Sequence, residues 1–309
     1  MLSRSADNLF WLARYMERAE ATARLIEMGR RMAMLPALPN RDEWRSVARA
    51  GGSDAFIGSP EALTEGAAVS LLLLREDNPA SIRSSFSRAR FNARAVRTAL
   101  TQQMWETLND GWRRLEGIDE GEARRDLASL LDWVKTRAAT FRGAADTSML
   151  RDDRYDFLRL GGLIERADAT LRLLDVKYYV LLPEADVIGG GRDHHQWTSV
   201  LFALNGMRAF HHAYKGDFSP WKIADFLILN RDFPRSIAFC YSQIVEHLNA
   251  LAARYGDHPP CSKTAWDSLV RLSRTQAGQI FGSGLHEFVG QAIVTNNRLA
   301  AEISEAYYF

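Results

Sequence analysis

Two segments of this 309-residue chain are near copies of each other, and this internal repeat constrains the fold more than any other feature. Residues 16–27 read MERAEATARLIE and residues 164–175 read IERADATLRLLD, at a constant offset of 148. Seven of the twelve positions are identical, and four others are conservative exchanges. Apolar residues recur at intervals of three and four in both copies, which is typical of a helix with one buried face.

A second pair of similar segments follows in the same order. The sequence DNPASI at residues 77–82 returns as DFPRSI at residues 232–237, at an offset of 155. Two matches in the same order favour duplication of a whole unit. We therefore expect one domain over residues 1–309, with repeat halves 1–150 and 151–309 and the additional residues of the second half near residues 189–191.

The remainder of the chain also predicts helices. No segment alternates apolar and polar residues convincingly with the period of two that marks a strand. The expected fold class is all-α, a helical bundle built from two duplicated halves. Helices are expected over roughly residues 3–34, 59–74, 82–100, 112–142, 198–212, 237–251, 265–279 and 285–308, with the second repeat copy helical through Val180. Ser3 or Ser5 is expected to cap the first of these.

Composition excludes several classes of protein. The chain holds 39 Lys and Arg residues against 38 Asp and Glu residues, so no overall field would attract nucleic acid or a membrane surface. Its two cysteines, Cys240 and Cys261, have no metal-binding or redox spacing, which favours a reducing compartment. The start of the chain lacks the apolar core of a signal peptide, and the longest apolar run, residues 67–74, is too short to span a membrane. We therefore expect a cytoplasmic protein.

Each repeat copy carries a Glu-Arg pair, Glu17–Arg18 and Glu165–Arg166. Neighbouring residues on a helix point about 100° apart, so the two members of a pair cannot bind each other. In a structural interpretation, these charges bridge the two halves and fix their register. In a second interpretation, arginine binds the carboxylate and glutamate the ammonium group of an amino acid or peptide terminus. In a third, Glu17 and Glu165 act as general acids or bases.

The same region supplies the candidate substrate-binding residues. Arg14 precedes the first pair by one helical turn, while Gly161 and Gly162 precede the second and would let a helix or a ligand approach closely. The candidate set is Arg14, Glu17, Arg18, Glu165 and Arg166.

Four arginines form a further candidate surface on the helix expected over residues 82–100. Arg83, Arg90, Arg94 and Arg97 share a face opposite the apolar stripe, and no acidic residue occurs from residue 81 to residue 100. This face either is solvated and paired with acids of another helix, or binds an acidic partner. The arginines do not alternate with aromatic residues, which disfavours nucleic acid as the partner.

The sequence contains no motif for a metal or another cofactor. The histidines have neither HExxH spacing nor a pair four residues apart. The glycines at residues 189–191 lack the spacing of a phosphate-binding loop, so they predict a flexible connection.

The opening LSRSADNLFWLARYMERAE at residues 2–20, together with DNPASIRSS at residues 77–85 and IERAD at residues 164–168, strongly resembles the alpha-E family. The resemblance covers essentially the whole chain; Ala13 stands where many members have glycine, which concerns only how closely a neighbour packs there. It implies a bacterial helical protein of unknown biochemical function. It also implies partners, namely circularly permuted ATP-grasp ligases and transglutaminase-like proteins of peptide or amide metabolism.

Two hypotheses follow from the motifs and the resemblance. In the first, the protein is an accessory module that binds the ligase, through Arg83, Arg90, Arg94 and Arg97, or presents its amino-acid or peptide substrate. In the second, it is an enzyme of amide or peptide chemistry that uses Glu17 and Glu165.

Overall fold

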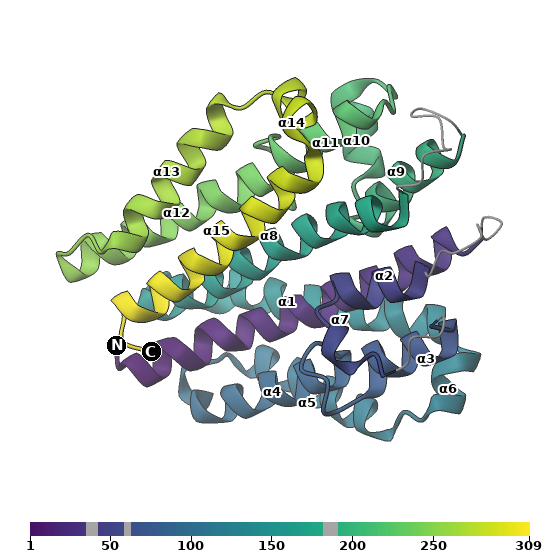
Figure 1. Ribbon diagram of the computed structural model, residues 1–309. Coiled ribbons are helices and arrows are strands. Elements are labelled where there is room, and N and C mark those ends of the chain that lie inside the picture. Colours follow the sequence, from purple (N-terminus) through teal and green to yellow (C-terminus); the bar gives the residue numbers. More distant parts are fainter. Residues whose placement is uncertain (35–42, 59–62, 182–190) are drawn as a thin grey trace.

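The computed structural model describes residues 1–34, 43–58, 63–181 and 191–309, and every regular element in these ranges is helical (Figure 1). The predicted all-α class is confirmed. The first half contains α1 (Ser3–Met32), α2 (Glu43–Ala50), η1 (Asp54–Phe56), α3 (Glu65–Val69), η2 (Ser70–Leu74), α4 (Ile82–Ala95), η3 (Arg97–Ala99), α5 (Gln102–Gly117), α6 (Glu120–Arg125) and α7 (Leu127–Ser148). The second contains α8 (Asp153–Leu181), α9 (Gly191–Ala203), α10 (Met207–Tyr214), α11 (Pro220–Ile228), α12 (Ile237–Tyr255), α13 (Pro260–Arg274), α14 (Ala277–Ser283) and α15 (Leu285–Ala306).

The two helices that carry the repeat, α1 and α8, lie side by side at the centre of the molecule (Figure 1). Their backbones approach closely because Gly161 of α8 has no side chain. A Cβ atom at this position would lie 2.0 Å from the carbonyl oxygen of Phe10 on α1. Glycine is therefore required here by the packing of the two helices.

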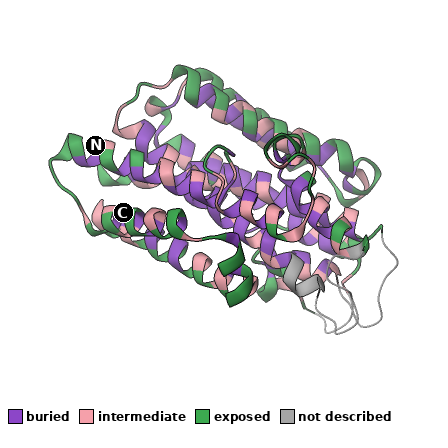
Figure 2. Ribbon diagram, turned by 90° about the horizontal axis from the view of Figure 1, so that it is seen from above, coloured by how far each residue is buried: buried purple, intermediate pink, exposed green. Residues whose placement is uncertain are grey.

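The outer helices surround this central pair in a corresponding way. Helices α4 and α7 pack against α1, while α12 and α15 pack against α8. Helices α2 and α9 each contact the central helix of the other half: α2 contacts α8, and α9 contacts α1. Buried residues concentrate along the central pair, whereas exposed residues lie on the outer faces (Figure 2).

In each half, one hydrogen bond links the two segments that are repeated in the sequence. The Thr22 hydroxyl on α1 donates to the Ala80 carbonyl at 3.1 Å, and the Thr170 hydroxyl on α8 donates to the Arg235 carbonyl at 2.8 Å. The two donors, Thr22 and Thr170, are 148 positions apart, and the two acceptors, Ala80 and Arg235, are 155 positions apart. These are the offsets of the sequence repeat. A duplication would produce such matched contacts, and it remains our interpretation of them.

Several helix boundaries differ from the predicted ones. The N-cap of α1 is Leu2, which makes no side-chain capping bond, and Ser3 and Ser5 lie inside the helix, so the predicted serine cap is wrong. Helix α4 ends at Ala95 because Val96 leaves the helical region at φ −118° and ψ 30°.

The segment expected to be helical over residues 112–142 is divided among α5, α6 and α7. Asp119 caps α6 by accepting from the Glu122 amide, which starts a new helix. The predicted start at residue 59 and most of the predicted insertion near residues 189–191 lie outside the described residues. None of the described helices is long and apolar enough to cross a membrane.

Candidate functional site

The glutamate of the second repeat copy binds arginines of the first. Arg18 donates from Nε to Glu165 Oε1 at 2.5 Å and from Nη2 to Oε2 at 3.0 Å. Arg14, one turn earlier on α1, donates from Nε to Glu165 Oε2 at 2.8 Å. Glu165 is 5% exposed, so these bonds neutralise a buried charge between α1 and α8.

The glutamate of the first copy binds the arginine of the second in the reciprocal way. Arg166 donates from Nε to Glu17 Oε1 at 2.8 Å and from Nη2 to Oε2 at 3.1 Å. Two further arginines reach Glu17: Arg142 of α7 lies 3.0 Å from Oε2, and Arg235, before α12, lies 3.4 Å from Oε1. Glu17 therefore faces three guanidinium groups and is 3% exposed.

A second buried carboxylate completes this group, which we call the Glu17 cluster: Glu17, Glu20, Arg24, Arg142, Arg166 and Arg235. Glu20 accepts from Arg24 Nη2 at 2.6 Å, from Arg235 Nη2 at 2.5 Å and from Arg142. Both oxygens of Glu20 are used, and the residue is 1% exposed. The cluster fills the space between α1, α7, α8 and the start of α12.

The arginines keep the motif glutamates ionised. Burial opposes ionisation of Glu165, but the charges of Arg18 and Arg14 outweigh it and lower its pKa to about 2. Burial is likewise outweighed at Glu17, where Arg166, Arg142 and Arg235 hold the pKa well below its ordinary value. A carboxylate of such low pKa is a weak base and is not protonated at neutral pH, which disfavours general acid–base roles for both residues.

The ion-paired group of Glu165, Arg14 and Arg18 lines a pocket. This pocket, which we call the α1–α8 pocket, has a volume of about 300 Å³. Its polar lining includes Arg14, Arg18, Glu165, Asp168 and Arg172, and the turn at Pro79 and Ala80 forms another wall. The space beside Glu17, Arg142 and Arg166 has a volume of only about 30 Å³. The ion pair of Arg18 with Glu165 and the ion pair of Arg166 with Glu17 therefore line two separate spaces.

Asp168 lines the α1–α8 pocket, and one of its oxygens is a buried acceptor to which no described residue donates. Its Oδ2 atom accepts from Arg172 Nε at 2.5 Å, but no described residue donates to Oδ1. Burial raises the pKa of this carboxyl, and the charge of Arg172 only partly offsets the effect. The side chains of Arg18 and Arg172 remain 23% and 32% exposed, so both can reach a ligand.

The structure divides the predicted substrate-binding set. Arg14, Arg18 and Glu165 line the α1–α8 pocket, whereas Glu17 and Arg166 lie in the Glu17 cluster. Four further residues at these two places had not been predicted as site residues from the sequence: Asp168, Arg172, Arg142 and Arg235. For Arg235 the sequence did hold a signal, because the first copy of the repeat has Ala80 at the corresponding position.

The four arginines predicted as a partner surface differ in their surroundings. Arg83 donates from Nη2 to the carbonyls of Leu115, at 3.0 Å, and Ile118, so it binds the C-terminal end of α5. Arg90 donates from Nε to Asn109 Oδ1 at 2.8 Å. Arg94 and Arg97 are exposed, and Arg97 lies over the ring of Trp105. Only the C-terminal two of the four are therefore available as a surface.

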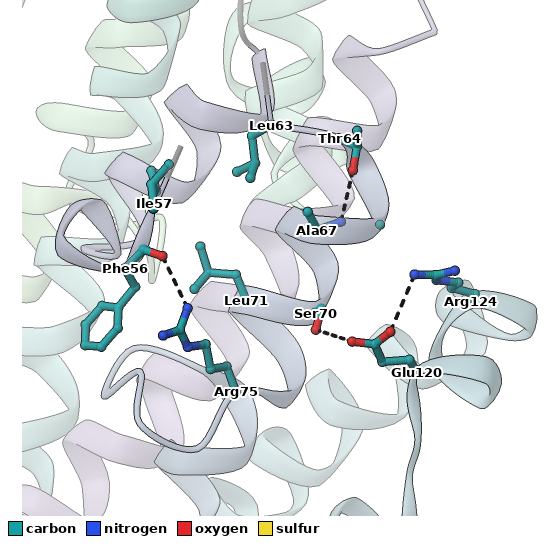
Figure 3. Close-up of a pocket in the computed structure, with 12 residues that line it drawn as sticks. Phe56, Ile57, Leu63, Thr64, Ala67, Ser70, Leu71, Arg75, Glu120 and Arg124 are labelled. Carbon is teal, nitrogen blue, oxygen red and sulfur yellow. Dashed lines mark hydrogen bonds and ion pairs between the residues drawn. The ribbon is translucent and has the colours of Figure 1, made fainter. Parts of the chain in front are cut away.

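A larger pocket of about 570 Å³ lies beside α3 and the π-helical turn η2 (Figure 3). Ser70 donates to Glu120 at 2.8 Å, and Glu120 forms an ion pair with Arg124 at 3.5 Å. Across the pocket, Arg75 donates to the Phe56 carbonyl at 3.3 Å. No residue of the repeated motif lines this pocket.

Two of the seven histidines pair with carboxylates of α8. His247 Nδ1 lies 2.9 Å from Asp156 Oδ1, and His286 Nδ1 lies 2.7 Å from Asp175 Oδ1. Within the described ranges, no group of three or more His, Cys, Asp and Glu side chains is placed to hold a metal ion. Cys240 and Cys261 are both free thiols in buried positions.

Comparison with known proteins places the chain in a family. It is 24% identical over 277 residues to an uncharacterized protein of Mycobacterium bovis, and equally so to uncharacterized proteins of two strains of Mycobacterium tuberculosis. The match covers 83% of this chain and 31% of each relative, so the chain spans about a third of their length. No solved structure matches the chain. Residues 1–308 match the family described as a predicted alpha-helical domain with a conserved ER motif, and the chain therefore belongs to the Alpha-E family.

Proposed function

We propose that the protein is an accessory helical module that binds an amino acid or the end of a peptide in the α1–α8 pocket. The bound molecule would be a substrate of an amide-bond-forming ligase, and the protein would present it or retain it. A second polypeptide carries out the bond-forming reaction in this proposal.

The open half of the Glu-Arg arrangement is the observation that carries the proposal. Arg18 and Arg172 present partly exposed guanidinium groups, which bind carboxylates through paired hydrogen bonds. Asp168 presents a buried oxygen to which no described residue donates. Positive and negative groups thus line one space of about 300 Å³, a volume suited to a small polar molecule.

The accessory role also rests on the family resemblance and on the relatives. The resemblance implies ATP-grasp ligases and transglutaminase-like proteins as partners. In the mycobacterial relatives, the matching region is 31% of the chain, so the helical region there accompanies a longer polypeptide. The alternative of an acid–base enzyme has less support, because Glu17 and Glu165 are saturated by arginines.

Calorimetric titration of the purified protein with free amino acids, dipeptides and their carboxyl-amidated derivatives tests the proposal. We expect at least one unmodified member to bind and its amide to bind at least tenfold more weakly. Arg172→Gln should weaken binding similarly, since its side chain is 32% exposed and lines the pocket. Arg154→Gln changes a partly exposed arginine outside the pocket, with a side chain 42% exposed, and serves as the matched control. If no member binds, the proposed function is wrong.

A docking surface on α4 is a second candidate role. Phe91 is 74% exposed, and Arg88 and Arg94 lie one turn before and after it on the same exposed face. An exposed aromatic residue between two cations is typical of a protein-binding surface. Phe91→Ala and Arg94→Glu should each weaken co-purification with the ATP-grasp protein by at least tenfold, while Arg154→Glu should not. Equal recovery with all three variants would contradict this role.

A further inference from the structure

The α1–α8 pocket and the Glu17 cluster occupy corresponding places in the two halves. Glu165, Asp168 and Arg172 on α8 correspond to Glu17, Glu20 and Arg24 on α1 at the offset of 148. The internal pairs also correspond, because Arg24 binds Glu20 as Arg172 binds Asp168.

Backbone contacts between the halves show the same correspondence. Arg24 Nη1 donates to the Ala203 carbonyl at the end of α9, and Arg172 Nη1 donates to the Ala50 carbonyl at the end of α2. Each acidic pair, Glu17 with Glu20 and Glu165 with Asp168, is therefore held by matching contacts, and we call the residues around each pair its frame. The residues of one frame can be compared with the corresponding residues of the other.

Two arginines fill the frame around the Glu17 cluster. Arg235 enters from the turn before α12 and binds both Glu20 and Glu17. Arg142 enters from α7 and also binds both of these carboxylates. Their side chains are only 15% and 23% exposed, so both arginines are largely buried beside the two acids.

Neither arginine has a counterpart in the α1–α8 pocket. Ala80 stands at the place of Arg235, as the matched hydrogen bonds of Thr22 and Thr170 show. Asn297 of α15 stands 155 residues after Arg142, and both Ala80 and Asn297 line the pocket. Arg14 replaces one of the missing contacts at Glu165, but nothing described donates to Asp168 Oδ1.

The number of arginines and carboxylates in the two frames indicates the charge of the group that the α1–α8 pocket lacks. In the Glu17 cluster, four arginines surround two carboxylates. In the pocket, Arg14, Arg18 and Arg172 are the only described arginines that accompany Glu165 and Asp168. One additional cation would give the pocket the same balance of charges as its filled counterpart.

We propose that the α1–α8 pocket binds the cationic end of its ligand, a guanidinium or alkylammonium group, against Asp168, in the place that the Arg142 and Arg235 side chains fill in the other half. This inference rests on the proposed function, and it narrows the ligand to an amino acid or peptide with a basic side chain or a free amino end. The guanidinium of arginine is the closest match, because the group that fills the counterpart is itself a guanidinium.

Titration with arginine and citrulline tests the charge requirement, because citrulline replaces the guanidinium by a neutral group of nearly the same shape. Arginine should bind at least tenfold more tightly than citrulline. Lysine, included as a third ligand, separates the two cations: equal binding of lysine and arginine indicates a general cation subsite, and weaker lysine binding indicates a guanidinium subsite. Equal binding of arginine and citrulline overturns the inference.

One variant fills the open space beside Asp168, and a second opens the filled space beside Glu20. Ala80→Arg supplies the missing side chain from within the chain, so it should fold normally and weaken arginine binding at least tenfold. Arg235→Ala opens the corresponding space at Glu20, and ethylguanidinium should restore part of the melting temperature that this variant loses. Ethylguanidinium should not raise the melting temperature of the Gly161→Ala variant, whose defect is steric.

The possible outcomes separate this inference from the proposed function. If other amino acids bind but the Ala80→Arg variant binds arginine as tightly as the wild-type protein, the cation subsite is wrong and the proposed function stands. If neither arginine nor any other member of the panel binds the wild-type protein, both are wrong. Failure of ethylguanidinium to stabilise Arg235→Ala also contradicts the inference, since it would show that the frame does not accept a free cation.

Discussion

Arg166 on α8 lies 2.8 Å from Glu17 on α1, and the second motif repeats this relationship in reverse, with Arg18 on α1 bound to Glu165 on α8. Because adjacent residues point about 100° apart on a helix, the two members of one motif cannot bind each other. Each instead reaches the other central helix. The repeated motif thus joins α1 and α8 by reciprocal buried ion pairs, and only the Glu165 side adjoins an open pocket.

Glu17→Gln should strongly destabilise the fold. The substitution leaves Arg142, Arg166 and Arg235 without their shared carboxylate in a buried position, and breaking a buried ion pair typically costs about 3–5 kcal/mol. Urea unfolding followed by circular dichroism measures the change in the free energy of unfolding. Glu116→Gln, at an exposed position, should change it by less than about 0.5 kcal/mol. A loss below about 1 kcal/mol for Glu17→Gln would show that the pairs do not hold the helices together.

Two adjacent glycines of α8 should respond differently to alanine. A Cβ atom at Gly161 would meet the Phe10 carbonyl oxygen at 2.0 Å, so α1 and α8 would have to separate. We expect Gly161→Ala to destabilise the protein by about 3 kcal/mol or more, at the upper end of overpacking effects. At Gly162 the nearest atom would be the Ala13 Cβ at 3.8 Å, an ordinary contact.

Gly162→Ala should therefore leave stability unchanged or raise it by up to about 1 kcal/mol, because alanine favours the helix. Thermal unfolding of both variants against the wild-type protein measures the contrast. Similar melting temperatures for the two variants would contradict the close approach of the helices at Gly161.

The sequence was sufficient to predict the fold class and the central role of the repeat. Apolar residues at helical spacing predicted α1 and α8, and residues such as Leu9, Met16 and Ile164 are buried as that spacing requires. The structural interpretation of the Glu-Arg pairs was also among the alternatives, because two charges beside a buried stripe need partners. The predicted duplication agrees with the matched bonds of Thr22 and Thr170 but is not established by them.

The composition of the pocket could not be predicted in the same way. Helical periodicity places a residue on a face of its own helix, but it does not say which other helix that face meets. Arg142 is 122 residues from Glu20 in sequence and Arg235 is 215 residues from it, so their contacts depend on the packing of α7 and α12. Arg83 shows the same limit, since it lies on the predicted basic face but binds carbonyls at the end of α5.

The stability of the fold should fall in acid between about pH 4.5 and pH 2. Burial opposes ionisation of Glu165 and Glu20, but neighbouring arginines outweigh it and lower each pKa from 4.5 to about 2. As the pH falls through 4.5, the unfolded chain therefore takes up protons before the folded one, and stability decreases. Linkage gives roughly 3 kcal/mol for each carboxylate, fully present above about pH 5.

Asp168 contributes with the opposite sign, because burial raises its pKa and its protonation favours the folded state as the pH falls. Urea midpoints measured from pH 7 to pH 2 test the profile. The decline should be smaller in Glu165→Gln, which lacks one of the responsible carboxylates. A wild-type profile that is flat down to pH 2 would contradict the ionised state of the motif glutamates.

The turn that carries Ala80 should control both stability and ligand binding through Asn78. This asparagine is fully buried, and its Nδ2 atom donates to Ser53 Oγ at 3.0 Å and to the Leu71 carbonyl at 2.9 Å. Its Oδ1 atom accepts from the Ala80 amide at 3.1 Å, which fixes one wall of the α1–α8 pocket. Asn78→Ala should therefore lower the free energy of unfolding by about 2–3 kcal/mol, because buried polar groups lose their partners.

The same variant should bind the pocket ligand at least fivefold more weakly at a temperature where it remains folded, because Pro79 and Ala80 are no longer held against α1. Asn230→Ala is the matched control: its Oδ1 atom accepts from the amides of Asp232 and Phe233 in the turn before α12, away from this pocket. It should lose stability but keep the affinity of the wild-type protein. Calorimetric titration of the two variants separates the effects, and equal affinities would show that the Asn78 turn does not shape the ligand site.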